Sequence, residues 1–174
     1  MEVSSVKFLT VRAPNGGVGS WLEADVALNV RPAPGSPGVM VSRVRIELLL
    51  GCELPALAGA GRRTEHYRAE AECVALEAGR ADVRFYLPPE IVKRDQVLAE
   101  PKLWSVEVTA GGRPQLASRT GASPALVNAE ALKGFQARAT AAGANDGLLV
   151  PQYLTPFAGE YPRATPSFAR REPR

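Results

Sequence analysis

Apolar and polar residues alternate at every second position through the first two-thirds of the chain, and this pattern limits the possible folds more than any other feature. It is clearest in residues 20–31, SWLEADVALNVR, where Leu22 and Val26 share one face and Glu23 and Asp25 share the other. Successive side chains of a β-strand point to opposite faces of its sheet. The period of two therefore predicts a strand with one face in a core and a mostly polar face turned outward.

Five further segments have the character of strands, and turn-forming residues separate them. They are residues 3–11, 39–50, 64–77, 79–87 and 102–110. Clusters of glycine, proline and asparagine lie between them, as in PNGGVG, RPAPGSPG and AGGRP, and such clusters are typical of turns. We therefore predict a mainly β fold, an Ig-like antiparallel β-sandwich of about seven strands.

The pattern changes after Thr120, where an alanine-rich segment predicts one helix at about residues 124–141. Ser123 is suited to cap the start of this helix, and Pro124 is suited to its first position. Apolar residues recur every four positions along one face, at Val127, Ala131, Phe135 and Ala139. This face is expected to pack on the sandwich.

The last segment, LLVPQYLTPFAGEYPRATPSFARREPR, combines prolines with aromatic residues. Its five prolines exclude a long helix or a central strand. Four of the eleven aromatic residues of the chain lie here, whereas disordered segments are poor in aromatic residues. The predicted layout is a sandwich over residues 1–120, a packed helix within 121–147 and an extended arm over 148–174.

The arm is the predicted interaction element of the chain. It has two possible receptors: its own sandwich, where it would cover a sheet edge, or another subunit, where it would build a homo-oligomer. A partner protein would be bound in the same way, through the arm and the sheet edges. The predicted contact residues are Tyr153, Phe157, Tyr161, Phe168, Arg170 and Arg171.

The residues that could carry chemistry give no sign of catalysis. His66 is the only histidine, so histidine triads and multi-histidine metal sites cannot form, and we expect it solvated on the outer face of a strand. Carboxylate pairs such as Glu23 and Asp25 are common on polar strand faces. The glycines of residues 14–20 join two strands and lack the following helix of a phosphate site. We predict a non-catalytic structural or interaction domain, not an enzyme, without cofactor or metal.

The charge and hydropathy of the chain limit its partners and its compartment. The net charge is +3 without a dense basic stripe, which argues against nucleic acid. No apolar run approaches the roughly 20 residues of a membrane span. The first residues, MEVSSVKFLTV, lack the basic and apolar regions of a signal peptide. The compartment is therefore periplasmic or cell-surface if a signal peptide has been removed, and otherwise cytoplasmic.

The two cysteines, Cys52 and Cys73, are predicted to be buried thiols. If residues 39–51 and 64–78 pair as a hairpin, position 50 faces about position 65, and Cys73 faces about position 42. Cys52 would then lie roughly 30 Å away along the strands, at about 3.3 Å per residue. A disulfide needs the two Cα atoms within about 7 Å, so it requires that these strands are not neighbours.

A carbohydrate-binding sandwich is the alternative function, because aromatic rings can stack on sugars. Trp21 and Tyr86 lie on otherwise polar strand faces and would be the binding rings. Trp104 shares its face with Val106 and Val108 and is predicted to lie in the core instead.

One resemblance rests on two stretches of the sequence, the predicted second strand SWLEADVALNVRP and the segment NDGLLVPQYLTPF that follows the predicted helix. In these stretches and in strand order, the chain resembles secreted Ig-like proteins encoded beside type IV pilus assembly genes in some Gram-negative bacteria. The resemblance implies a periplasmic or surface role in pilus assembly. It carries over no functional residue.

Overall fold

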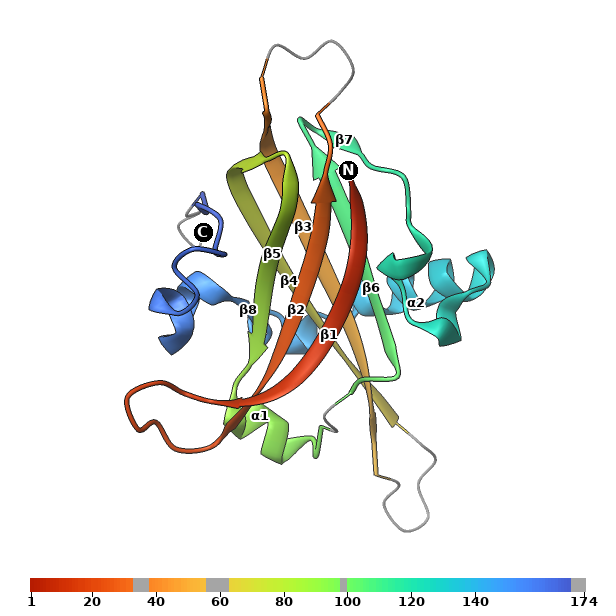
Figure 1. Cartoon of the computed structure of the whole chain (residues 1–174). Coiled ribbons are helices and arrows are strands. Elements are labelled where there is room, and N and C mark those ends of the chain that lie inside the picture. Colours follow the sequence, from red (N-terminus) through yellow and green to blue (C-terminus); the bar gives the residue numbers. More distant parts are fainter. Residues whose placement is uncertain (33–37, 56–62, 98–99, 170–174) are drawn as a thin grey trace.

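Two antiparallel sheets stack face to face in the computed structural model, which describes residues 1–32, 38–55, 63–97 and 100–169 (Figure 1). Within these residues each sheet has four strands. The first has the order β1 (Glu2–Arg12), β2 (Ser20–Val30), β5 (Gly79–Leu87) and β8 (Val150–Pro151). The second has the order β4 (Arg63–Glu77), β3 (Met40–Leu54), β6 (Leu103–Ala110) and β7 (Arg113–Pro114). The predicted mainly β sandwich is confirmed.

The core lies between the two sheets and follows the alternation of the sequence. Val26 of β2 stands opposite Val83 of β5, and Leu48 of β3 stands opposite Val106 of β6. All four side chains are buried. Trp104 is buried as predicted, and its ring packs 5.9 Å from that of Phe8 on β1, so it joins the two sheets across the core. The inward residues of six strands thus form one apolar cluster.

The pairing of β3 with β4 differs from the expected register by two residues. Leu50 stands opposite Tyr67 rather than opposite position 65. The ladder continues to Leu54 and Arg63. The midpoint of the loop between the two strands therefore lies one residue further along the chain than the midpoint of the expected hairpin. The polarity pattern alone does not reveal this shift, because a slip of two residues keeps every side chain on the same face.

Both thiols are buried and free, as predicted. Cys52 stands opposite Glu65, and Cys73 stands opposite Val44. Burial in the apolar core raises the pKa of each thiol to about 12.

A thiol reagent is therefore expected to leave the folded protein unlabelled at about pH 8 and to label two thiols after unfolding, because the thiolate is the reactive form. Absorbance of the released reagent measures the count. Fast labelling of the folded protein would contradict the burial of Cys52 and Cys73.

Two α-helices cover different parts of the sandwich. The short α1 (Pro89–Arg94) follows β5, and its Ile91 and Val92 pack against the core. The longer α2 (Ala129–Ala141) lies on the outer face of the second sheet. Its Phe135 is fully buried. Gly51 of β3 allows this approach, because a Cβ there would lie 2.9 Å from the Phe135 ring.

The predicted start of α2 at residue 124 is wrong. Residues Pro124–Leu126 form a 3-10 turn, and the helix starts after Asn128, whose side chain accepts a hydrogen bond of 2.8 Å from the backbone of Glu130. Asn is a strong N-cap. The Ser123 side chain instead accepts from the Trp104 backbone on β6. Val127 precedes the helix and is exposed rather than packed.

Five 3-10 helices complete the described secondary structure: η1 (Arg119–Gly121), η2 (Pro124–Leu126), η3 (Gly143–Asn145), η4 (Gln152–Leu154) and η5 (Pro156–Gly159). The last two lie in the arm. The prolines of the arm therefore exclude a long helix, as predicted, but allow these short turns. In the described part of the chain, no helix has the length and apolar character needed to cross a bilayer.

Candidate interaction surfaces

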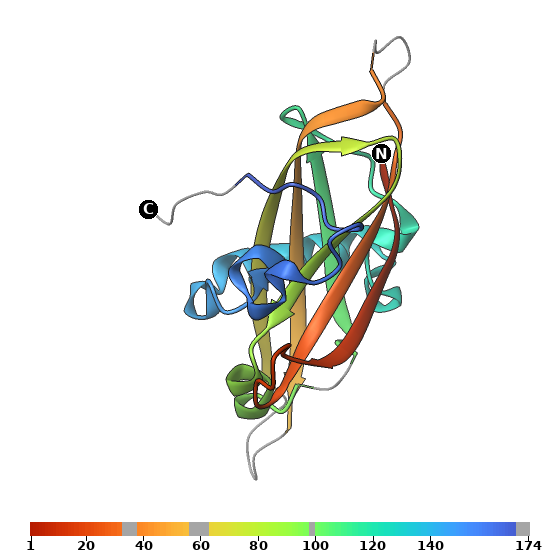
Figure 2. The ribbon, with the colours of Figure 1, turned by 60° about the vertical axis from the view of Figure 1, so that its left-hand side comes forward.

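The arm docks on its own sandwich and pairs with an edge of each sheet. At its start, Val150 of β8 stands opposite Tyr86 of β5. Near its end, the Val74 backbone of β4 donates to the Ser167 carbonyl at 2.9 Å, and the Ala169 backbone donates to the Glu72 carbonyl at 2.8 Å. Figure 2 shows the arm, in blue, in front of the strands at this side. Of the two predicted receptors, the structure uses the first, and the arm closes the side of the sandwich where β5 and β4 lie.

The arm has its own hydrogen-bonded framework. The side-chain amide of the fully buried Gln152 donates to the carbonyls of Phe157 at 3.0 Å and Glu160 at 2.9 Å. The Thr155 hydroxyl accepts from the Phe157 backbone at 3.1 Å and caps η5. The segment between β8 and Phe168 is thus a compact loop rather than an extended strap, because its backbone groups bond within the loop.

Phe157 is the anchor of the arm. Its ring stacks on the ring of Tyr86, with centroids 4.4 Å apart and planes 6° apart, and it meets Trp21 edge-on at 5.6 Å. Phe157 is only 4% exposed. At the far end, the rings of Tyr153 and Phe168 lie 5.1 Å apart. Of the other predicted contact residues, Arg170 and Arg171 lie outside the described residues.

A cluster of charged residues lies beneath the arm on the outer face of the first sheet. The Tyr86 hydroxyl donates to the Glu23 carboxylate at 2.7 Å, and the Arg84 guanidinium donates to Asp25 at 3.3 Å. The Tyr161 ring covers Arg84, with the guanidinium carbon 4.1 Å from its centroid. Glu23 is 1% exposed and Arg84 is 5% exposed. The polar face of β2 is therefore largely buried by the arm, not solvated.

Glu23 makes the stability of this region depend on pH. Burial raises the pKa of its carboxyl above the usual 4.5, although the Tyr86 hydrogen bond and the Arg84 charge act in the opposite direction. Because the folded state holds this proton more tightly than the unfolded state, its stabilising effect is complete below pH 4.5. The effect is lost as the pH rises through the raised pKa.

Glu23→Gln is expected to remove this dependence, because the amide stays neutral. The free energy of unfolding of the variant relative to the unmodified chain should rise between about pH 4 and about pH 8. Urea denaturation at both pH values measures it. An unchanged difference would show that folding does not raise the pKa of Glu23, and a falling difference would show that the folded state favours the ionised form.

The alternative carbohydrate site is not an exposed pair of rings. Tyr86 has no exposed surface, and Trp21 is only partly exposed. Phe157 lies against both rings. The expectation of two ring faces open to a sugar is wrong. The arm covers the rings together with the polar residues beside them, so this strand face is not in water.

The expectation that His66 is solvated is also wrong. The chain covers it with α2, whose Phe135 ring lies 5.8 Å from the imidazole. Burial lowers the pKa of His66, and the charge of Arg138 on the same helix acts in the same direction. The half-buried imidazole of His66 thus packs against α2. Within the described residues, no group of three or more histidine, cysteine or acidic side chains could hold a metal ion.

Asn145 fixes the chain just before the arm. Its amide donates to the Glu65 carboxylate at 2.7 Å and to the His66 carbonyl at 3.1 Å. It also accepts from Arg94, which pairs with Asp95 at the end of α1. This residue begins the segment that carries the resemblance described above, and in the structure it connects α1, β4 and the root of the arm.

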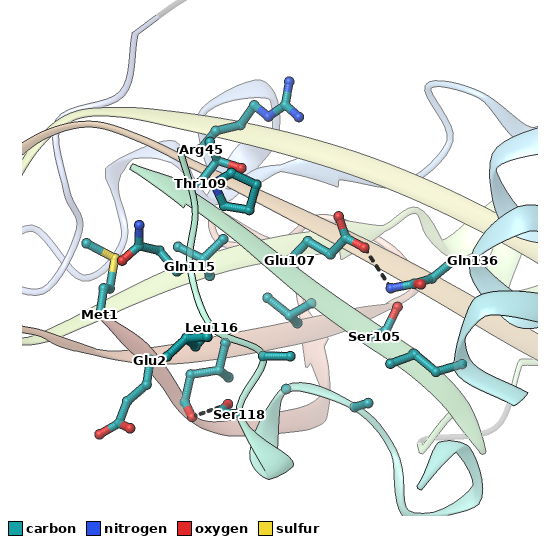
Figure 3. Close-up of a pocket in the computed structure, with 18 residues that line it drawn as sticks. Met1, Glu2, Arg45, Ser105, Glu107, Thr109, Gln115, Leu116, Ser118 and Gln136 are labelled. Carbon is teal, nitrogen blue, oxygen red and sulfur yellow. Dashed lines mark hydrogen bonds between the residues drawn. The ribbon is translucent and has the colours of Figure 1, made fainter. Parts of the chain in front are cut away.

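A groove of about 330 Å³ lies on the opposite side of the sandwich (Figure 3). The chain is still bonded to β6 at Gln115, whose backbone donates to the Val108 carbonyl. It then turns away from this edge and returns to β6 at Ala122, which pairs with Ser105. The cavity lies between this segment, β6, α2 and the start of β1. At one end the Glu107 carboxylate accepts from Gln136 at 2.6 Å. The neighbouring hydroxyl of Ser105 is buried without a hydrogen-bond partner among the described residues.

Comparison with known proteins supports the fold. No protein-family model and no curated protein matches the chain. A crystal structure of a protein from Akkermansia muciniphila superposes with a TM-score of 0.74 and 16% identity, over 98% of this chain and 92% of that one. At this identity the likeness shows the fold alone. It extends over nearly all of the chain.

Proposed function

We propose that the chain is a non-catalytic structural or protein-interaction domain that takes part in the assembly of a pilus or of the cell surface. The observation that carries the proposal is the asymmetry of the sandwich. The arm closes the β5 and β4 edges, while β1 is the outermost strand of its sheet on the opposite side. An open sheet edge is a site where proteins add a partner's strand.

The position of the polar groups supports a non-catalytic role. Glu23 and Asp25 lie beneath the arm, and the two thiols lie in the core with raised pKa values. Asp25 is paired with Arg84. A catalytic group must reach its substrate, and these groups face neighbouring protein atoms.

The pilus setting rests on the resemblance of residues 20–32 and 145–157 to the secreted Ig-like proteins named above. The corresponding compartment is the periplasm or the cell surface. In the organism that encodes the chain, deletion of the gene is expected to reduce surface appendages seen by electron microscopy, and the intact gene should restore them. A deletion strain with unchanged appendages would contradict this setting.

Site-specific photo-crosslinking in the same cells tests which side of the sandwich binds. A photoreactive residue at Leu9 of β1 should give a discrete crosslinked product. The same residue at Leu154, which is exposed on the arm, is the matched control and should give none. Products from Leu154 alone would assign the interaction to the arm side and contradict the role of the open edge.

A further inference from the structure

We propose that the edge of β1 from Ser5 to Arg12 binds an extended, acidic segment of a partner protein by strand addition. This inference rests on the proposed role as an interaction domain, and it names the surface and the chemistry of the partner. A strand that joins this edge would continue the sheet β1–β2–β5–β8 beyond β1.

The geometry of β1 defines where the open edge begins. The register with β2 is interrupted between Val3 and Ser5 and is then continuous from Ser5 opposite Ala27 to Arg12 opposite Ser20. Before the interruption, the Val3 carbonyl accepts hydrogen bonds from Ser118 and Thr120, so η1 occupies this end. The open stretch is roughly 26 Å long at about 3.3 Å per residue, which matches a strand of ordinary length.

The other edges are less open than β1. The β5 edge pairs with β8, and the β4 edge pairs with the last described residues of the arm. The β6 edge pairs with β7 at Thr109 and Ala110, and Gln115 and Ser123 bond to it on either side of the groove. Within the described residues, the stretch of β1 from Ser5 to Arg12 has no backbone hydrogen bond besides those of its ladder with β2.

The side chains of β1 favour an apolar alternation in the added strand. On the inner face, Val6 and Phe8 are partly buried and pack against the core. On the outer face, Leu9 is 49% exposed, and Val11 stands opposite Trp21. Neighbouring strands contact each other through directly opposite side chains. Because alternate side chains of a strand point to opposite faces, an added strand with apolar residues at alternate positions would cover Val6 and Phe8 with its apolar face and place its other face beside Lys7.

The charge of this edge selects an acidic partner. Lys7 and Arg12 are exposed, and they give the stretch from Ser5 to Arg12 a charge of +2. The acidic residue opposite Lys7 on β2 is Asp25, which is engaged by Arg84. Two copies of β1 paired edge to edge would bring four positive charges onto one short ladder, where they would repel one another. The occupant is therefore an acidic segment of another protein and not a second copy.

Binding of synthetic peptides to the full chain tests this inference. One fluorescent peptide of about nine residues alternates valine with glutamate, and its control replaces each glutamate by lysine. The acidic peptide should bind in an anisotropy titration, more weakly as salt is added, and the basic peptide should not. Hydrogen exchange should show new protection in Ser5–Arg12 and not in β4.

A charge-reversed variant provides the decisive comparison. Lys7→Glu with Arg12→Glu changes two exposed side chains, and circular dichroism verifies that the variant folds. Affinity for the acidic peptide should fall at least about tenfold, and affinity for the basic peptide should rise. The inference is overturned if neither peptide binds, if the charge reversal has no effect, or if β1 is protected in a homodimer without peptide. If only these peptide results fail while the gene deletion still removes the appendages, the proposed function stands without the β1 assignment.

Discussion

Replacement of Phe157 by alanine is expected to lower the free energy of unfolding by about 3 to 4 kcal/mol and to release the arm. The ring is 4% exposed, and its loss leaves the faces of Tyr86 and Trp21 without their partner. Water then reaches the buried pair of Glu23 and Arg84. Urea denaturation measures the stability, and trypsin cleavage after the exposed Arg163 measures release of the arm.

Leu154→Ala is the matched control, because Leu154 lies on the same loop but is 64% exposed. Its effect on stability should stay within about 0.5 kcal/mol. Equal effects of the two substitutions, or a Phe157 variant whose arm resists trypsin as well as the original, would show that the ring does not anchor the arm.

A chain that ends at Leu149 is expected to lose more stability than the Phe157 variant and to associate into larger species. This truncation keeps Leu149, which belongs to the core, but it removes β8 and every arm contact with β4 and β5. Unpaired strand edges bind one another, so light scattering after size-exclusion chromatography should report an increased mass. A synthetic peptide of residues 150–169, added during refolding, should reduce that mass. A truncated chain with the original mass and stability would contradict the protective role of the arm.

The sandwich was predictable from the sequence because alternation at period two is a local signal. Each strand shows its inner face in its own residues, as Leu22 and Val26 do in β2. The short helix at Pro89 has a local signal of the same kind, because its double proline and the following apolar pair are adjacent in sequence. The hairpin register was not, since a slip of two residues between β3 and β4 preserves the pattern.

The buried charge cluster was not predictable from local pattern. Glu23 and Asp25 look like an ordinary solvated pair, and their burial depends on Arg84 and on Tyr161 of the arm, both distant in sequence. One signal was present: charged residues alternate in both β2 and β5, and these strands pair. Combined with an aromatic arm, two such faces could have indicated a covered polar cluster. The groove at Ser105 has no such signal, because it arises from the path of residues 114–122.

The sequence suggested a carbohydrate site at Tyr86 because the neighbours of this residue along its strand are polar. A tyrosine among Glu, Asp and Arg on a strand resembles an exposed ring. In the structure the ring of Tyr86 lies between its own sheet and Phe157, and its hydroxyl is satisfied by Glu23.

The central claim is that the arm docks on its own sandwich, and the contact between the rings of Phe157 and Tyr86 tests it most directly. In nuclear Overhauser spectra of the uniformly labelled protein, these rings should give a strong cross-peak, since their centroids are 4.4 Å apart. In a mixture of labelled and unlabelled chains, an isotope-filtered spectrum should lack this cross-peak. A cross-peak that also appears in the filtered spectrum would place the arm on a neighbouring molecule, and its absence from both spectra would show that the arm is not docked.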